Sequence, residues 1–480
     1  MKSLLSVFFE GFLGGFAAFL MPCIYPMLPL TISFFSKKDG SRNGAIGQAL
    51  LYGFSIILIY VIFGGLITAF LGPQALNGLA SSGWFNLSVF FLLLIFAISF
   101  FGVFEINLPS SLVNKADSIS GARSFLGIFF MAFTLSLVSF SCTAGIIGTL
   151  LVEAVRSKQY YALVTGMAGF SLALALPFTL AAIFPSALKS LPKSGSWLNS
   201  VKVVLGFLEL ALSLKFLSSF DLVYHTGLLS REVFLVLWIV IFAFLGMYLL
   251  GKIKLSHDTA LTHVSVPRLF FSLFSFAFAL YLVPGLWGAP LTAISGLAPP
   301  LSSQEFILRS GSAPAEEVAR LPANRKYATL FQEPDGLEGF YDYKEAQMFA
   351  RKVNKPLFID FTGHSCVNCR KMEQTIWSDP RVRQRLNNNF ILVSLYVDEK
   401  KELPVSEQYT SKVFGNRVVS VGNLNSDLQA TRFNTNSQPF YVVADKDGNA
   451  LVKPSQYDAD VDNYIAFLDK GLQAYKQKYK

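Results

Sequence analysis

The chain has 480 residues, of which 52% are hydrophobic and 47 are phenylalanine. This composition excludes an ordinary soluble protein of that length. The formal net charge is +9, but the sequence has no basic patch interleaved with aromatic residues, so no nucleic-acid partner is expected.

Charged residues are divided unevenly along the chain. Residues 1–295 contain 16 Lys+Arg and 9 Asp+Glu, against 24 and 22 in residues 296–480. The first part therefore predicts a polytopic α-helical membrane domain, over 1–290, embedded in a lipid bilayer. A stretch rich in Pro, Ala, Ser and Gly, 291–340, predicts a linker. An α/β domain of thioredoxin-like order is expected over 341–480.

The first part contains apolar runs long enough to cross a bilayer, which takes about 20 residues. Eight spans are expected, at 5–35, 45–71, 84–104, 122–152, 160–184, 198–219, 231–251 and 268–289. Cys23 and Cys142 lie at similar depths in the first and fourth spans. Because a repeat of three spans must insert upside down relative to its copy, spans 1–3 and 4–6 predict an inverted pair.

Lysine and arginine in the loops set the expected orientation of the spans. Odd-numbered loops hold Lys37, Lys38, Arg42, Lys115, Arg123, Lys189, Lys193, Lys252, Lys254 and Arg268, and even-numbered loops hold Arg156, Lys158 and Arg231. The odd loops therefore face the cytoplasm, and with eight spans both termini lie outside. We expect residues 5–35 to be a span and not a cleaved signal peptide, because Glu10 interrupts the apolar run and no small-x-small site follows.

The first span contains the unusual stretch "MPCIYPMLPL". Proline removes a backbone donor and breaks a helix, and irregular backbone at membrane depth is tolerated only where it is buried in protein or lines a cavity. Pro22, Pro26 and Pro29 are therefore expected to place Cys23 on a movable segment that lines such a cavity. Because Cys23 and Cys142 are symmetrically placed and the sequence has no other cysteine besides the C-x-x-C pair, both are predicted to be functional.

The second part predicts a compact α/β domain. Residues 342–354 have the pattern of an amphipathic helix, and 355–361 and 390–397 that of buried strands. "PFYVVADKDGNALVK" predicts a hairpin that turns at Asp447-Gly448, and 460–476 predicts a closing helix. Strand, C-x-x-C, helix, strand and helix follow one another in the order of a thioredoxin-like domain.

The C-x-x-C is formed by Cys366 and Cys369, where a strand gives way to a helix. Unpaired N–H groups and the positive end of the helix dipole stabilise a thiolate there. Cys366 is expected to attack and Cys369 to resolve the mixed disulfide. Asp360 is predicted to be a proton acceptor beneath the pair and Glu373 to tune the same equilibrium. Pro439 is predicted to be a cis-proline that faces the motif.

Plainer interpretations remain open for several of these residues. A C-x-x-C is also half of a zinc site, but only His364 is near enough to add a ligand, so no metal is expected. Asp360 and Glu373 could be solvated residues, and Pro439 an ordinary turn residue. Inside the sixth span, Glu209 and Lys215 are further candidates because ionisable residues in a membrane are costly.

The chain resembles the DsbD family of thiol:disulfide interchange proteins and its shorter relative, CcdA. The resemblance lies in "PCIYPMLP" in the first span, "SCT" at 141–143, and "KPLFIDFTGHSCVNCRKMEQTIWSDPRVRQRL" in the second part. It covers nearly the whole chain. The family usually has a separate N-terminal periplasmic domain, which is not expected here. The segment 398–437 is longer than a minimal thioredoxin needs.

The resemblance implies a protein-disulfide reductase of the bacterial inner membrane. Cytosolic thioredoxin would reduce Cys23 and Cys142, which would then reduce Cys366 and Cys369 on the periplasmic side. Periplasmic thiol proteins would be the final acceptors: apocytochrome c, a disulfide isomerase or a separate partner domain. No bound cofactor is implied. An oxidase running in the opposite direction and a transporter or Cu(I)-handling protein are the alternatives.

Overall fold

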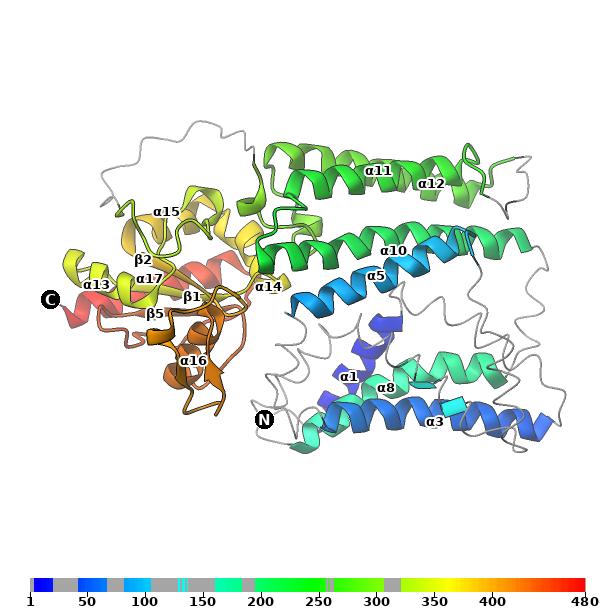
Figure 1. Ribbon diagram of the computed structural model, residues 1–480, viewed down its shortest axis with the longest axis horizontal. Helices are drawn as coiled ribbons and strands as arrows, with labels where there is room; N and C mark the ends of the chain where they lie inside the picture. The colour runs from blue at the N-terminus through cyan, green and yellow to red at the C-terminus, as the bar shows by residue number, and fades with distance from the viewer. Residues whose placement is uncertain are drawn as a thin grey trace. The chain divides into compact units, whose positions relative to one another are not determined.

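A computed structural model describes residues 4–19, 42–66, 82–104, 160–183, 195–255, 263–305 and 321–479, with 128, 129, 132, 133, 136 and 258 in addition. The chain divides into two compact units (Figure 1). The first comprises 1–80, 88–213 and 244–272, and the second comprises 81–87, 214–243 and 273–480.

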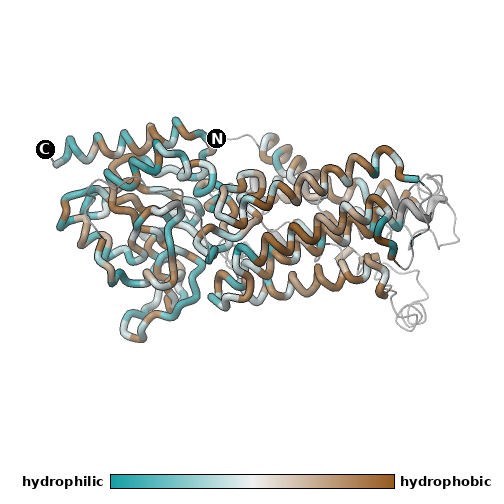
Figure 2. The backbone as a smooth tube through the Cα atoms, turned by 90° about the horizontal axis from the view of Figure 1, so that it is seen from above, coloured by the Kyte–Doolittle hydropathy of each residue, from teal (hydrophilic) through white to brown (hydrophobic). Residues whose placement is uncertain are grey.

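Seven apolar helices occupy the described part of the first 290 residues. They are α1 (Leu4–Phe19), α3 (Arg42–Leu66), α5 (Gly83–Phe100), α8 (Tyr160–Ile183), α10 (Gly195–Tyr224), α11 (Arg231–Leu249) and α12 (Val266–Leu282). Four helical stretches are long and apolar enough to cross a membrane, namely Gly83–Phe100, Asn199–Tyr224, Arg231–Leu249 and Val266–Trp287. In Figure 2 these helices are predominantly brown, whereas the domain beyond residue 341 mixes brown with teal.

Four of the eight expected spans therefore coincide with helices that are long and apolar enough to cross a membrane, and three more overlap the shorter apolar stretches of α1, α3 and α8. Most of the fourth expected span, 122–152, lies outside the described residues, as do Pro22, Cys23, Pro26, Pro29 and Cys142. The inverted repeat stays a prediction.

Helices α1 and α8 pack against each other through glycines. A Cβ atom built on Gly11 would lie 2.2 Å from the carbonyl oxygen of Gly166, and one on Gly15 would lie 2.3 Å from that of Phe170. From the other side, a Cβ atom on Gly169 would lie 2.3 Å from the carbonyl oxygen of Phe8. Membrane helices associate largely by close packing, so small residues at this seam let the two backbones approach.

The α/β domain contains a three-stranded sheet in the order β2-β1-β5. Its strands are β1 (Leu357–Thr362), β2 (Ile391–Tyr396) and β5 (Phe440–Ala444), and its helices are α13 (Tyr343–Val353), α14 (Val367–Met372), α15 (Pro380–Asn389), α16 (Val421–Phe433) and α17 (Val461–Lys478). Strand β1 pairs in parallel with β2 and antiparallel with β5. The segment 398–437 holds a small second sheet, β3 (Tyr409–Thr410) with β4 (Arg417–Val418), and the whole of α16.

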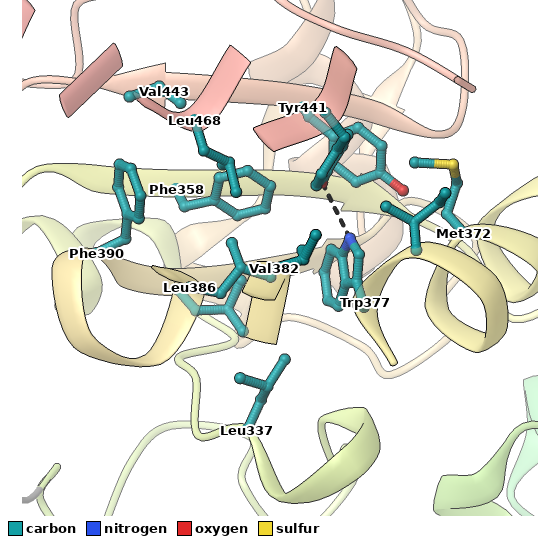
Figure 3. Packing of buried hydrophobic residues seen from close by; sticks show 13 residues of the cluster. Leu337, Phe358, Met372, Trp377, Val382, Leu386, Phe390, Tyr441, Val443 and Leu468 are labelled. Atoms are coloured by element: carbon teal, nitrogen blue, oxygen red, sulfur yellow. Dashed lines mark hydrogen bonds between the residues drawn. The ribbon is translucent and has the colours of Figure 1, made fainter. Parts of the chain in front are cut away.

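Alternation along β1 gives the sheet two hydrophobic faces. Phe358 joins the cluster on one face, where Trp377, Leu386 and Leu468 come from the segment after α14, from α15 and from α17 (Figure 3). Trp377 Nε1 donates a hydrogen bond of 3.0 Å to the hydroxyl of Tyr464. On the other face, residues of α13 pack against Leu357, Ile359 and Phe361. Asp360 has the parity of Phe358, so it lies on the face that carries α14.

Parts of the expected linker 291–340 are packed against the protein. Leu337 belongs to the core of the α/β domain, Phe340 pairs with Val393, and the ring of Phe331 stacks on that of Tyr396 with centroids 4.4 Å apart. Upstream, Gln304 Nε2 donates to the carbonyl oxygen of Leu286 at 2.9 Å. A few apolar residues of this stretch therefore contribute to the folded structure, although Pro, Ser and Gly are abundant around them; the linker bounds stay a prediction.

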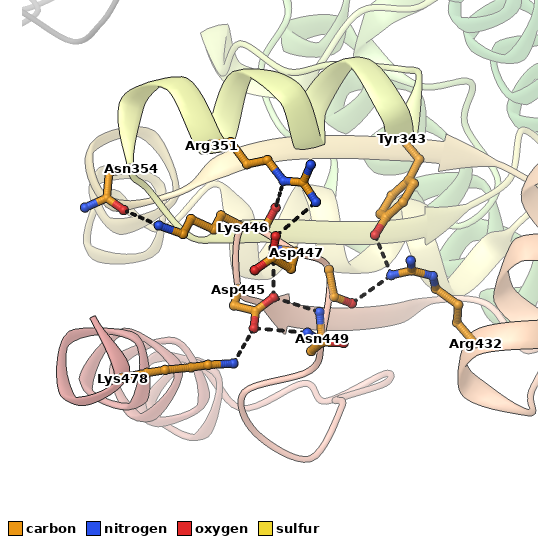
Figure 4. Close-up of polar contacts among 10 residues, drawn as sticks. Tyr343, Arg351, Asn354, Arg432, Asp445, Lys446, Asp447, Asn449 and Lys478 are labelled. Carbon is orange, nitrogen blue, oxygen red and sulfur yellow. Dashed lines mark hydrogen bonds and ion pairs between the residues drawn. The ribbon is translucent and has the colours of Figure 1, made fainter. Parts of the chain in front are cut away.

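The expected hairpin turns at Asp447-Gly448, and Gly448 has φ of +86°. The Asp445 carboxylate accepts hydrogen bonds from the backbone N–H groups of Asp447 and Asn449, both at 2.9 Å, and from Lys478 Nζ at 2.6 Å (Figure 4). Lys478 thus ties the end of α17 to the turn that follows β5.

We expect Gly448→Ala to destabilise this hairpin by about 2 kcal/mol or more. A Cβ atom there would lie 1.8 Å from the Tyr343 hydroxyl oxygen and 2.4 Å from Arg432 Nη1, besides meeting the cost of positive φ. Gly415→Ala is the matched control, since Gly415 has φ of +70° with nothing within 4 Å. Hydrogen exchange of β5 amides in the full chain measures the difference. Equal effects of the two variants would contradict the steric part of this expectation.

Candidate redox site

The candidate site lies where β1 ends and α14 begins. Strand β1 is buried along its whole length, and His364 and Ser365 lead from it into Cys366, the N-cap residue of α14. The Asp398 carboxylate holds this loop, because it accepts hydrogen bonds from the backbone N–H groups of His364, at 2.9 Å, and Ser365, at 3.0 Å. A charged acceptor from the segment after β2 thus fixes the approach to the cysteines.

Cys366 and Cys369 form a disulfide with a Cα–Cα distance of 5.3 Å. The Sγ atom of Cys366 accepts a hydrogen bond of 3.1 Å from the backbone N–H of Cys369. Cys369 is only 1% exposed, whereas Cys366 is partly exposed. The two sulfurs therefore differ in access, and the more accessible one lies at the end of the helix where free N–H groups favour a thiolate.

Beneath α14 the protein buries a group of ionisable residues. Asp360 is 2% exposed, and its Oδ1 atom has no hydrogen-bond partner among the described residues. Burial raises the pKa of Asp360 well above its usual value, the charges of Glu373 and Glu333 add to the rise, and Arg370 opposes it. A carboxyl group whose pKa is raised in this way is a stronger proton acceptor, when it is ionised, than an exposed aspartate.

Glu373 is buried and paired. Its Oε1 atom lies 2.7 Å from Nη2 of Arg370, which also donates to the Thr362 hydroxyl at 3.2 Å. Although burial alone would lower the pKa of Arg370, the Glu373 carboxylate leads the interactions that raise it, so the guanidinium stays charged. The plain interpretation of Asp360 and Glu373 as solvated residues is therefore wrong, and Arg370 is a buried counter-charge that no sequence pattern indicated.

Glu333 is a second residue that the sequence did not single out. It lies in the segment expected to be linker and is 6% exposed. Burial raises its pKa to about 8, and the charge of Glu373 adds to the rise. With Asp360 and Glu373 it makes three buried carboxyl groups for one guanidinium.

The peptide bond between Gln438 and Pro439 is cis, as expected, and Pro439 is buried at the start of β5. Its predicted role in positioning substrate backbone stays a prediction. Glu209 lies on α10 and is 1% exposed, and neither of its carboxylate oxygens has a partner among the described residues.

Two histidines and a glutamate, among them His364 two residues before Cys366, form a group that could hold a metal ion. His225, just beyond α10, and His364 both place Nε2 near Oε2 of Glu399, at 2.9 and 3.0 Å. The hydrogen bond to Glu399 raises the pKa of His225. These three are the residues of the described chain that could hold a metal ion.

Stability of the α/β domain is expected to fall as pH rises from about 4.5 to about 8. In that window an unfolded Glu333 loses its proton while the folded one keeps it, so the unfolded state binds fewer protons. The free energy of unfolding is expected to fall by up to about 1.4 kcal/mol per pH unit because of this one group. Glu333→Gln should reduce the pH dependence of the unfolding free energy, whereas Glu338→Gln, at an exposed position, should leave that dependence unchanged. Hydrogen exchange of β1 amides between pH 5.5 and 8 measures it, and a dependence unchanged by Glu333→Gln would contradict the assignment.

Comparison with known proteins gives two family matches. Residues 4–220 match the family model described as cytochrome C biogenesis protein transmembrane domain, and residues 339–444 match the thioredoxin-like model. Thiol:disulfide interchange proteins named DsbD are similar over most of the chain. The one from Haemophilus influenzae (strain 86-028NP) is 26% identical over 80% of this chain and 59% of its own length. The one from Salmonella typhimurium is 27% identical over 79% of this chain and 59% of its own length. The chain thus spans about three fifths of the length of the curated relatives it matches.

Proposed function

We propose that this chain, which is similar to DsbD proteins over most of its length and has matches to a membrane-domain model and a thioredoxin-like model, is a transmembrane thiol:disulfide reductase. The observation that carries the proposal is the Cys366–Cys369 disulfide at the start of α14, with one sulfur accessible and the other buried. Two buried carboxyl groups and a guanidinium accompany it. That arrangement suits reversible exchange of a disulfide for two thiols.

The reaction is a series of disulfide exchanges. A dithiol of cytosolic thioredoxin reduces a Cys23–Cys142 disulfide, and the resulting dithiol reduces Cys366–Cys369. The outer dithiol then reduces a client disulfide on the far side. Each exchange moves two electrons and two protons, so no bound cofactor is needed. Clients of this class are thiol proteins of the periplasm: apocytochrome c, a disulfide isomerase or a separate partner domain.

Within the outer domain, we assign attack to Cys366 and resolution to Cys369. The Cys366 thiolate attacks a client disulfide, and Cys369 then displaces the client by forming the internal disulfide. Cys369 must lose its proton to do so, and Asp360 lies on the sheet face beneath α14, where it can accept one. Glu373 and Arg370 adjust the pKa of Asp360, because the charge of Glu373 raises it and the charge of Arg370 lowers it. These two are positioning residues.

The proposed location is the bacterial inner membrane, with both termini on the periplasmic side. The excess of Lys and Arg in odd-numbered loops supports that orientation. A structural contact also supports it. His225 follows α10, in the sixth loop, and its Nε2 lies 2.9 Å from Oε2 of Glu399 in the thioredoxin-like domain. This contact supports a topology in which the sixth loop and that domain lie on the same side of the membrane.

The redox state of Cys366 and Cys369 in cells with and without cytosolic thioredoxin tests the function. Mass-tagging of free thiols should find the pair largely reduced when thioredoxin is present and oxidised when it is absent. A pair that is oxidised in both cases would indicate an oxidase or a protein of another function. Copper-dependent protection of Cys23 and Cys142 from the tag would favour the Cu(I)-handling alternative.

A further inference from the structure

Three side chains that the redox proposal does not use meet beside the disulfide. Nε2 of His225 and Nε2 of His364 lie 2.9 and 3.0 Å from the same atom, Oε2 of Glu399. The Glu399 side chain is 1% exposed and that of His364 is 7% exposed, whereas His225 is 34% exposed. A buried carboxylate thus faces two imidazoles, one of which is open to water.

The positions of these groups are fixed by their surroundings. Glu399 Oε1 accepts a hydrogen bond of 2.7 Å from the backbone N–H of Lys401. The His364 ring packs against two aromatic rings, with its centroid 4.7 Å from that of Tyr396 and 5.8 Å from that of Phe331. Its backbone N–H is held by Asp398. Ligand side chains that are already oriented by their own hydrogen-bond and packing partners lose little conformational entropy when they bind a metal ion.

We propose that His225, His364 and Glu399 bind one divalent first-row transition-metal ion, with Zn²⁺ the ion that the donor set fits best. Two imidazole nitrogens and a carboxylate oxygen are donors that zinc accepts, and they leave a fourth position for water. Nitrogen donors exclude Mg²⁺ and Ca²⁺, which prefer oxygen alone. No cysteine takes part, so the site differs from the cysteine-based zinc site that the C-x-x-C might have formed with His364.

The distances are close to what zinc needs. The three donor atoms all lie within 4.8 Å of one another. Donors on a tetrahedral zinc with bonds of about 2.0–2.1 Å are separated by about 3.3 Å. Small rotations of the exposed His225 side chain are enough to bring the set to that spacing. Binding requires both Nε2 atoms to be free of protons, so a proton is released from each imidazole that carries one there.

The site would link two segments that are distant in sequence. His364 precedes Cys366 by two residues, and His225 is the first residue after α10. A bound ion would therefore hold the loop before the disulfide to the outer end of α10.

Titration of the oxidised full-length protein in detergent with Co²⁺, a spectroscopic substitute for Zn²⁺, tests the site. One equivalent should give the visible absorption of four- or five-coordinate cobalt, and Zn²⁺ should displace it. His225→Asn and Glu399→Gln should each lower the affinity at least about tenfold. Replacing His263 with Asn is the matched control, because this histidine is not in the cluster, and it should leave the affinity unchanged.

Several results would overturn the proposal. Absence of cobalt absorption in the oxidised wild-type protein would do so, as would affinity that survives both His225→Asn and Glu399→Gln. A sulfur-to-cobalt charge-transfer band that appears only after reduction would identify the cysteines as the ligands instead. Circular dichroism of each variant shows whether it is folded, and His225→Asn, at the exposed ligand, is the variant least able to disturb the fold.

Discussion

Replacing Cys369 with serine is expected to trap Cys366 in mixed disulfides, and replacing Cys366 with serine to abolish them. Cys366 is the accessible sulfur and lies at the start of α14, so its thiolate still attacks. Without the buried Cys369 thiol, nothing displaces the partner. Non-reducing electrophoresis with peptide mass spectrometry on each variant measures the adducts.

The proteins or residues that are joined to Cys366 in these mixed disulfides test whether the two halves of the chain exchange electrons. Some adducts should join Cys366 to outer clients, and some should join it to Cys23 or Cys142, after Cys366 attacks a disulfide between those two. Ser365→Ala is the matched control, since it changes the neighbouring residue and keeps both sulfurs. If Cys369→Ser gives client adducts but never a link to Cys23 or Cys142 with thioredoxin active, the two halves do not exchange electrons directly. The reductase proposal would then fail.

Removing either membrane cysteine should prevent reduction of the Cys366–Cys369 disulfide in the outer domain. In cells that carry Cys23→Ser or Cys142→Ser, the Cys366–Cys369 pair should stay oxidised, and reduction of clients should fall to background. A single remaining thiol can form a mixed disulfide but cannot release two electrons by closing a disulfide of its own. Mass-tagging of the outer thiols measures this, with Ser141→Ala as the control that keeps both thiols.

The opposite result would be informative. An outer pair that remains reduced in Cys23→Ser would show that electrons reach Cys366 from another donor. In purified, oxidised protein, free alkylation of both Cys23 and Cys142 under denaturing conditions would contradict their pairing, which requires Cα atoms within about 7 Å.

Local sequence patterns predicted the elements that carry the redox pair. Strands β1 and β2 are continuous apolar runs, and α13 and α17 have a clear helical period, so each could be placed to within a few residues. Helix α16 was not predicted, because "VGNLNSDLQATRF" is rich in residues of low helix propensity and has no apolar stripe. Its formation depends on packing against the rest of the domain.

The buried charges could not be predicted for a different reason. Arg370 and Glu373 are three residues apart on a short helix, a spacing that usually indicates an exposed pair. Only the tertiary structure shows that both are buried over β1. Glu333 and His225 come from segments far from the C-x-x-C in sequence, so no spacing rule connects them with it. The roles of Cys23 and Cys142 remain predictions from sequence, since both lie outside the described residues.

The segment between Gln304 and Leu321 connects two packed parts of the chain, and its length limits the distance that the Cys366–Cys369 disulfide can move. Gln304 is anchored to Leu286, and Leu321 packs against the core of the thioredoxin-like domain. The intervening chain spans at most about 55 Å even when fully extended. A tether of that length keeps Cys366 at an effective concentration of a few millimolar near its own membrane domain. On the proposed function, reduction of the outer disulfide by the membrane domain of the same chain would then be fast regardless of expression level, and the supply of clients would set the turnover.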